Sequence, residues 1–335
     1  MGQAGDRLIR RRALLAALGA GASGSVRPQV PEQPLPLARL LLGAPPGGVG
    51  DLMARRLADK LRGRYARSVV VENRPGAGGQ LAAVAMKQGP DDGSLLLLTP
   101  SSLLTLYPHT YRQLPYRPDT DLAPAALVAW SAMAFAAGPA VPGTVRDFND
   151  FLAWARAHPR AASYGSPASG SMPHLLVASL AHARGVGLTH IAYRGSTPAL
   201  QDLRGGTLPA HAGPVGVFLP HLKSGHVRLL AVSGIRRSAF VPEVRTWREQ
   251  GHAVDAREWY GFFLPGRSKP GIVQHAAAVL RAAMLQPDMS EALAAFGLEP
   301  AAAAANGPAE LAGQMRADLE EWREPVRRIG FSAES

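Results

Sequence analysis

The chain contains no cysteine among its 335 residues. Disulfides, thiolate metal sites, cysteine nucleophiles and cysteine-linked lipid anchors are therefore excluded. Aromatic residues are scarce as well, at 6% of the sequence. This argues against a pocket that stacks many sugar rings or bases.

Acidic residues are too few to balance the basic ones, and the formal net charge is +11. Such a charge is typical of proteins that bind nucleic acid or an anionic membrane. The basic residues are nearly all arginine, however, and they occur singly or in pairs among acidic residues without forming a stripe. We therefore expect no nucleic-acid partner, and a basic module for nucleic acid or anionic lipid remains the less favoured alternative.

Residues 1–22 have the three parts of an export signal. A basic stretch contains Arg11 and Arg12, an apolar run covers 13–18, and small residues at 20–22 form a cleavage site. The run is shorter than the roughly 20 residues that span a membrane, so we expect cleavage near Ala22 and a periplasmic product. The arginine pair leaves twin-arginine and Sec export equally open. Residues 23–36, rich in Pro, Ser and Gly, are predicted to be a linker.

Beyond the linker, short apolar runs alternate with segments typical of helices. Strands are expected at 37–42, 68–72 and 95–99, and each is followed by a turn rich in glycine or serine. Asp51 is predicted to be the N-cap of the first helix. The pattern recurs between residues 145 and 204, so the sequence predicts an α/β fold with two mostly parallel sheets flanked by helices. Ligands of such sheets bind beyond the carboxyl ends of the strands.

The glycine loops lack the residues of known enzyme motifs. The loop at 76–79 has Leu81 where a dinucleotide fingerprint needs its third glycine, and the loop at 45–50 has no P-loop lysine. The serines around Ser169 form no nucleophile elbow, and the histidines show no metal-binding spacing. We therefore predict no catalytic residue, metal or cofactor. Asp51 and His174 are the one acid/base pair that would support the alternative of an extracytoplasmic enzyme on this scaffold.

Each glycine or serine loop opens a helix, and the N–H groups at a helix N-terminus attract anions. Hydroxyl groups of Ser101, Ser166, Ser169, Ser196 and Thr197 add further donors. These loops contain few carboxylates or aromatic side chains, which favours a compact anion over a sugar or a cation. We expect a small mono- or dicarboxylate near Gly48, Gly79, Ser166 and Ser196.

Several motifs together resemble the extracytoplasmic solute receptors of the tripartite tricarboxylate transporters, often called Bug proteins. The resemblance covers nearly the whole chain after the linker and keeps the family's order and spacing. It departs from the family at Gly43-Ala44, at 211–214 and at 266–270, which leaves the identity of the ligand open. The motifs are PPGGVGD (45–51), VVVENRPGAGG (69–79), PDDGSLL (90–96), LPY (114–116), YGS (164–166), SGS (169–171), YRGSTPALQDL (193–203), RLLAV (228–232) and WYG (259–261).

The resemblance implies a two-lobed periplasmic-binding-protein clamshell of type II. The expected first lobe comprises 37–137 and 257–335, and the second comprises 138–256. It also implies a monomeric receptor, and not an enzyme, that binds a carboxylate in the cleft and delivers it to membrane transporter subunits or a sensor. The implied ligand-binding residues are Gly47, Gly48, Asp51, Gly78, Gly79, Ser101, Ser166, Ser169, Gly170, His174, Tyr193, Gly195, Ser196 and Thr197.

Overall fold

The computed structural model describes residues 33–303 and 306–333. The predicted signal peptide at 1–22 and the linker as far as residue 32 lie outside the described residues. The first strand, β1, begins at Leu35, so residues 35–36 belong to this strand and not to the predicted linker. Within the described ranges, no helix has both the length and the apolar character to cross a membrane.

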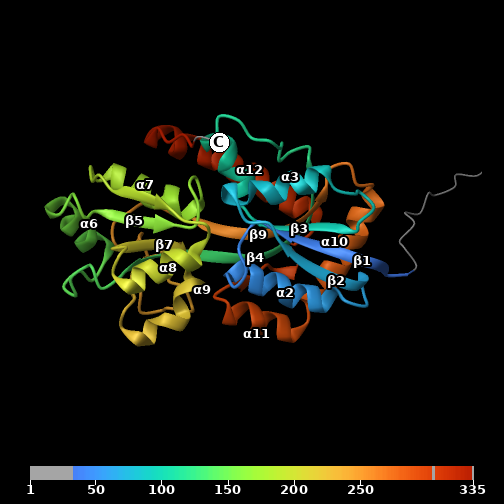
Figure 1. Cartoon of the computed structure of the whole chain (residues 1–335), viewed down its shortest axis with the longest axis horizontal. Helices are drawn as coiled ribbons and strands as arrows, with labels where there is room; N and C mark the ends of the chain where they lie inside the picture. The colour runs from blue at the N-terminus through green and yellow to red at the C-terminus, as the bar shows by residue number, and fades with distance from the viewer. Residues whose placement is uncertain (1–32, 304–305, 334–335) are drawn as a thin grey trace, which may run out of the picture. The chain divides into compact units, whose positions relative to one another are not determined.

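Strands and helices alternate along most of the described chain, as the sequence predicts (Figure 1). The sequence prediction overlooked β7 and the short helix α9. The elements are β1 (Leu35–Leu42), α2 (Val49–Leu61), β2 (Ala66–Asn73), η1 (Ala77–Gly79), α3 (Gln80–Gln88), β3 (Leu95–Pro100), α4 (Ser102–Thr105), α5 (Tyr107–Thr110), β4 (Leu122–Ala137), α6 (Phe148–Ala157), β5 (Ser163–Ser166), α7 (Met172–Ala183), β6 (Thr189–Ala192), α8 (Ser196–Gly205), β7 (Ala210–Pro214), α9 (Val215–Phe218), η2 (Leu219–Ser224), β8 (Arg228–Val232), β9 (Arg257–Pro265), α10 (Pro270–Met284), α11 (Pro287–Ala295), β10 (Glu299–Pro300) and α12 (Pro308–Ile329).

The strands form one path in the order β2-β1-β3-β9-β4-β7-β5-β6, and β8 and β10 also pair with β4. Pairing is parallel within β2-β1-β3 and within β7-β5-β6. It is antiparallel from β3 to β9, from β9 to β4 and from β4 to β7. Because of these reversals, the two parallel groups run in opposite directions and their carboxyl ends face each other.

Strand β4 joins the two groups (Figure 1). Its segment Leu122–Ala132 pairs with β9, and its segment Met133–Ala137 pairs with β7. Both β4 and β9 therefore run between the groups. The lobe boundaries predicted at residues 137 and 257 stay a prediction, because β4 belongs by its pairing to both groups.

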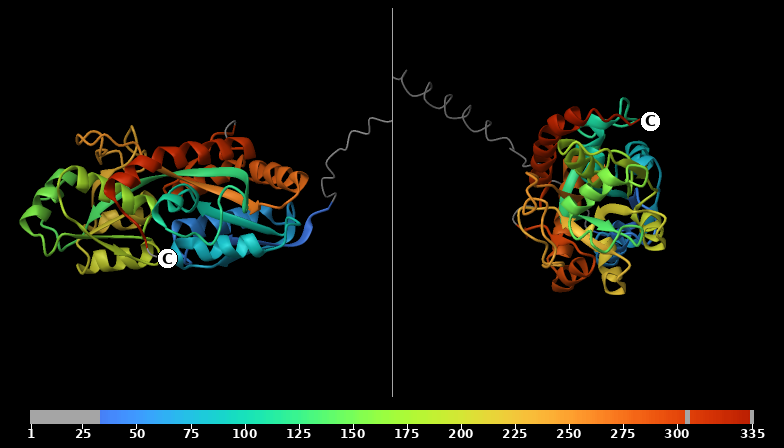
Figure 2. Two further views of the ribbon diagram at one scale, coloured as in Figure 1. Left: turned by 90° about the horizontal axis from the view of Figure 1, so that it is seen from above. Right: turned by 90° about the vertical axis from the view of Figure 1, so that its left-hand side faces the viewer.

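Helices cover both faces of the sheet, which explains why the inner strands are apolar throughout. Leu95–Leu98 of β3 are all buried. In α2, the buried residues Met53, Leu57 and Leu61 recur every four positions and form one face of the helix. Figure 1 and Figure 2 show α3 and α12 on one side of the β1–β3 group and α2 and α11 on the other.

A buried hydrogen bond fastens the C-terminal helix to the crossing strand β9. Trp259 Nε1 donates to Asp318 Oδ2 at 2.6 Å, and Gln314 Nε2 donates to the other carboxylate oxygen at 2.7 Å. Burial raises the pKa of Asp318, although both hydrogen bonds act to lower it. Because both residues are buried, Asp318 and not water is the hydrogen-bond acceptor of the Trp259 indole N–H.

We expect Asp318→Ala to lower the free energy of unfolding by about 1–3 kcal/mol, because it leaves the buried Trp259 N–H without an acceptor. Urea denaturation measures this loss. The matched control is Glu320→Ala on the same helix, which removes only an exposed ion pair with Arg323 and should change little. Equal unfolding midpoints for the two variants would contradict the structural role of Asp318.

Candidate ligand-binding site

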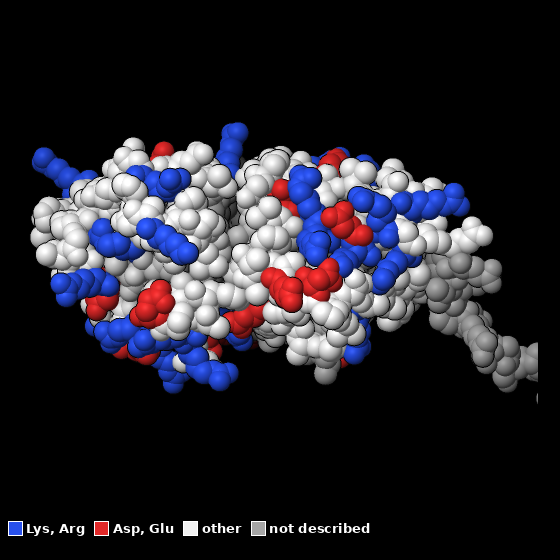
Figure 3. All heavy atoms as spheres, turned by 90° about the horizontal axis from the view of Figure 1, so that it is seen from below, with Lys and Arg blue, Asp and Glu red and all other residues white. Residues whose placement is uncertain are grey.

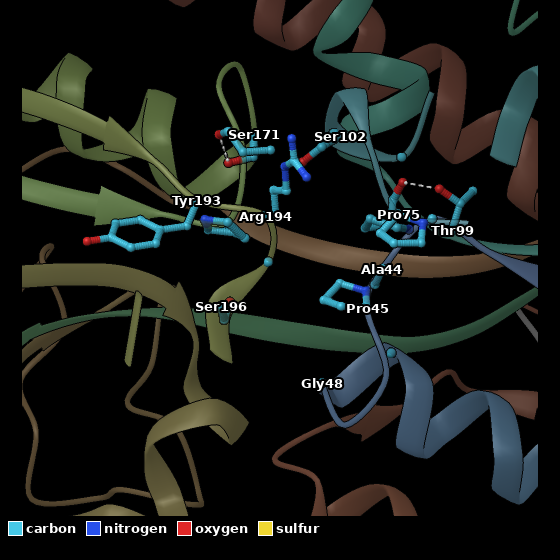
Figure 4. Close-up of a pocket in the computed structure, with 18 of the residues that line it drawn as sticks. Ala44, Pro45, Gly48, Pro75, Thr99, Ser102, Ser171, Tyr193, Arg194 and Ser196 are labelled. Carbon is cyan, nitrogen blue, oxygen red and sulfur yellow. Dashed lines mark hydrogen bonds between the residues drawn. The ribbon is translucent and has the colours of Figure 1, made fainter. Parts of the chain in front are cut away.

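The loops at the facing carboxyl ends of the strands line one cavity of about 340 Å³. Loops after β1, β2 and β3 contribute from one group, and loops after β5 and β6 contribute from the other. Figure 4 shows residues of both groups directed toward this space. The volume lies at the lower end of the range for small-molecule pockets, so the cavity suits a small ligand.

Eight of the fourteen residues predicted for the site line this pocket, and they come from both groups of strands. They are Gly48, Gly78, Gly79, Ser169, Tyr193, Gly195, Ser196 and Thr197. The other six are absent from the lining and lie in or next to the same loops. They are Gly47, Asp51, Ser101, Ser166, Gly170 and His174.

Asp51 organises the first loop from behind. Its carboxylate accepts hydrogen bonds of 2.9 Å from Gly47 N, Arg55 Nε and Asn73 Nδ2. Burial acts to raise the pKa of Asp51, but these hydrogen bonds bring it below its ordinary value. The N-cap of α2 is Gly48 and not Asp51, so that prediction was wrong: the helix begins three residues earlier, and the Asp51 side chain reaches back to Gly47.

A histidine pair supports the loop after β5. His174 Nδ1 accepts from Gly170 N at 2.9 Å, and its ring stacks on His190 with centroids 3.6 Å apart. Ser166 Oγ lies 2.8 Å from His190 Nε2 and donates to Ala168 O. Ser166, Gly170 and His174 thus shape the loop through these hydrogen bonds.

The two adjacent serines after β3 have different positions. Ser101 is completely buried away from the pocket, whereas Ser102 lines it and donates a hydrogen bond to Glu258 Oε1. Ser102 Oγ in turn accepts from Met172 N at 2.9 Å. The sequence prediction placed both serines in a cleft loop but chose only Ser101 as ligand-binding, and it overlooked Glu258.

The lining also contains side chains that the sequence prediction did not expect. Arg194 and four tyrosines, at 107, 111, 193 and 260, line the pocket together with Glu258. Only Tyr193 had been predicted, so the view of the cleft as poor in aromatic side chains was wrong. Glu258 is the sole carboxylate among the described lining residues, in agreement with the expectation of few carboxylates. The WYG motif had pointed to β9, but nothing in it indicated which residue faces the cleft.

Two helices begin at the pocket. Gly48, the N-cap of α2, lines it, and so do Gly195, the N-cap of α8, and Ser196, the first residue of α8. The first N–H groups of a helix have no partner within it. The Gly79 N–H, by contrast, is engaged with Gly76 O at 2.8 Å. Donors for a ligand therefore come mainly from α2 and α8.

Close approach across the pocket requires glycine at position 195. Gly195 has φ of 97°, and a Cβ there would lie 2.7 Å from Pro45 Cγ. Gly195 follows β6 and Pro45 follows β1, so this contact joins the two groups of loops beside the cavity.

A family model described as the tripartite tricarboxylate transporter family receptor matches residues 53–326. The chain belongs to this receptor family. BugT of Bordetella pertussis is 31% identical over 306 residues and the match covers 90% of each chain. The structure of the periplasmic binding protein BugD is 25% identical in sequence and has a TM-score of 0.81. The match covers 91% of this chain and 100% of BugD. An R. palustris protein solved with adipate is 26% identical and has a TM-score of 0.82. The match covers 89% of this chain and 98% of that protein.

Membership of this family confirms the predicted clamshell fold, because the solved relatives are periplasmic binding proteins of the same architecture. The family consists of solute-binding receptors associated with tripartite transporters. Family members are periplasmic, and carboxylates are the ligands seen in solved relatives.

Two buried histidines and one partly buried histidine make stability depend on pH. Burial lowers the pKa of His174 to about 3 and those of His190 and His211 to about 4. Unfolded histidine titrates near 6.5. Below that pH the unfolded chain binds protons at these histidines, and the folded chain does not. Their contribution to the free energy of unfolding is therefore complete above about pH 6.5 and is lost as the pH falls toward 4. Each histidine contributes a slope of up to about 1.4 kcal/mol per pH unit.

We expect His190→Gln to reduce this slope, since glutamine keeps an N–H donor for Ser166 and does not titrate. Urea unfolding at pH 7.5, 6 and 5 measures the slope. His226→Gln, at an exposed position, is the matched control and should leave the slope as in the wild type. A slope unchanged in His190→Gln would contradict the role given to the histidine pair.

Proposed function

We propose that this protein is an exported receptor that binds a small mono- or dicarboxylate in the interlobe pocket and delivers it to membrane transporter subunits or a sensor. The observation that carries the proposal is the convergence of loops from both groups of strands, with the N-termini of α2 and α8, on one small cavity. Adipate bound in a solved relative supports the ligand class. The receptor acts as a monomer and needs no cofactor.

A carboxylate in this pocket is held by hydrogen-bond donors whose positions the fold already fixes. The N–H groups of Ser196 and Thr197 and the hydroxyls of Ser169 and Ser196 form the proposed anion-binding set. A hydrogen bond to a charged group contributes about 1.5–3 kcal/mol. About four to six of them offset the ordering costs and leave the roughly 8 kcal/mol of micromolar binding.

The eight lining residues among the fourteen predicted are proposed to contact the ligand, and the other six to hold the loops in position. We propose that the protein has two lobes that close on the ligand, with β4 and β9 as the hinge. The first lobe comprises residues 37–137 and 257–335, and the second comprises residues 138–256. Support comes from the pairing of β4 with β9 on one side and with β7 and β8 on the other. The ligand favours closure only by its higher affinity for the closed form.

The alternatives find less support. Asp51 and His174, the acid/base pair of the enzyme hypothesis, both lie outside the pocket lining. On the face shown in Figure 3, Lys and Arg are interspersed with Asp and Glu, and the surface is hollowed between its two halves. This distribution favours a small ligand over a nucleic acid or an anionic lipid surface.

Calorimetry with a panel of carboxylates, amino acids, sugars and polyamines tests the ligand class, and we expect micromolar binding of a small carboxylate. Gly48→Leu should abolish it: Gly48 lines the pocket with an ordinary φ of −79°, and a Cβ would meet only Pro45 O at 3.8 Å. The added side chain therefore fills the cavity without straining the backbone. Ser196→Ala, which removes one hydroxyl, should weaken binding less.

The matched control is Gly143→Leu, at an exposed glycine outside the pocket lining where an added Cβ would meet no atom within 4 Å. It should bind like the wild type. Melting temperatures of both variants verify folding. Tight binding of a neutral sugar or a polyamine, with no carboxylate bound, would refute the proposed function.

We propose periplasmic export with cleavage near Ala22, on the basis of the basic flank, the short apolar run and the small-residue site. Mass spectrometry of the protein from its native host should find a mature N-terminus at or near Ser23. An intact N-terminus at Met1 or Gly2 would refute the signal.

A further inference from the structure

The pocket has one ionisable acid and one cation. Among the described residues that line it, Glu258 is the sole Asp or Glu, and Arg194 is the sole Lys, Arg or His. The remaining lining consists of backbone, hydroxyl and apolar groups. A pocket whose other polar groups suit an anion thus includes a carboxyl group that would repel one.

The position of Glu258 is fixed by its neighbours. It is the second residue of β9, opposite Ser131 of β4, and only 5% of it is exposed. Its Oε1 accepts a hydrogen bond from the Ser102 hydroxyl, and Ser102 Oγ accepts the N–H of Met172. These two hydrogen bonds hold the Ser102 side chain against Glu258.

Glu258 lacks a positive partner in the described part of the chain. Its neighbour Arg257 pairs with Glu299 at 3.4 Å and lies over the Trp130 ring. The groups that face Glu258 are the Ser102 hydroxyl and the phenols of Tyr107 and Tyr260, whose own pKa values burial raises. Burial raises the pKa of Glu258 to about 7, and no cation acts to lower it. A buried carboxylate without a counter-charge is unfavourable until one is supplied.

We propose that Glu258 determines the specificity of the pocket by accepting an ammonium group of the ligand, so that the ligand is an amino-carboxylate and not a dicarboxylate. The inference rests on the proposed function, which supplies the carboxylate-binding end. The ammonium group provides the missing counter-charge, whereas a second carboxylate at that end would face Glu258 directly.

The test compares ligands matched in length. Calorimetry on the purified protein uses 3-aminopropanoate against succinate, 4-aminobutanoate against glutarate, and 5-aminopentanoate against adipate. We expect the amino acid of the best-fitting pair to bind at least about tenfold more tightly than its dicarboxylate. Glu258→Gln, which keeps an acceptor for Ser102, should remove or reverse this preference, and Gly143→Leu should retain it.

The wild type alone provides a second measurement, which does not depend on how the variant folds. Because burial raises the pKa of Glu258 to about 7, its ionised fraction rises between pH 6 and pH 8, and amino-acid affinity should rise with it, by up to about tenfold. Neither end group of the amino-acid probes titrates there. Dicarboxylate affinity that falls over the same interval agrees with the assignment.

Preference for the dicarboxylates, or a preference unchanged in Glu258→Gln, overturns the inference and leaves the proposed function standing. Absence of binding by any carboxylate in both series overturns the two together.

Discussion

The antiparallel pairing of β4 with β9 is the constraint on which the rest of the structure depends. It extends from Leu122 opposite Pro265 to Ala132 opposite Arg257. Because β9 is also antiparallel to β3, and β4 to β7, the parallel strands on the two sides point toward each other. Loops that lie far apart in the sequence therefore meet at one place. The pocket follows from strand direction before any side chain is considered.

Strand periodicity, helix signals and the glycine loops were sufficient to predict the fold class and most elements, because these features are local. The face on which a residue lies was harder to predict. Ser101 and Ser102 are equivalent in sequence, and only the path of the chain into the four-residue helix α4 buries one and exposes the other to the pocket. Glu258 was missed for a similar reason, since its role depends on a contact with Ser102, 156 residues away.

The protein's charge and the pocket's donors act over different distances. The protein's net positive charge attracts anions from a distance, and salt screens this attraction. Within the pocket, Arg194 and Glu258 balance each other in number, so binding there depends on oriented N–H and hydroxyl groups. The long-range field thus favours the arrival of any anion, while the pocket decides which one is retained.

Ser102 connects this choice to the relation between the lobes. Its hydroxyl accepts from Met172 at the start of α7 and donates to Glu258 on β9, so one atom links the loop after β5 to the acid of the pocket. Separation of the two groups of loops would break the bond to Met172. A single hydrogen bond contributes only about 0.5–1.5 kcal/mol, which is too little to keep the pocket closed alone. In the proposed receptor, a ligand that neutralises Glu258 would leave Ser102 in its place, and its own contacts with both groups would supply the remaining preference for the closed form.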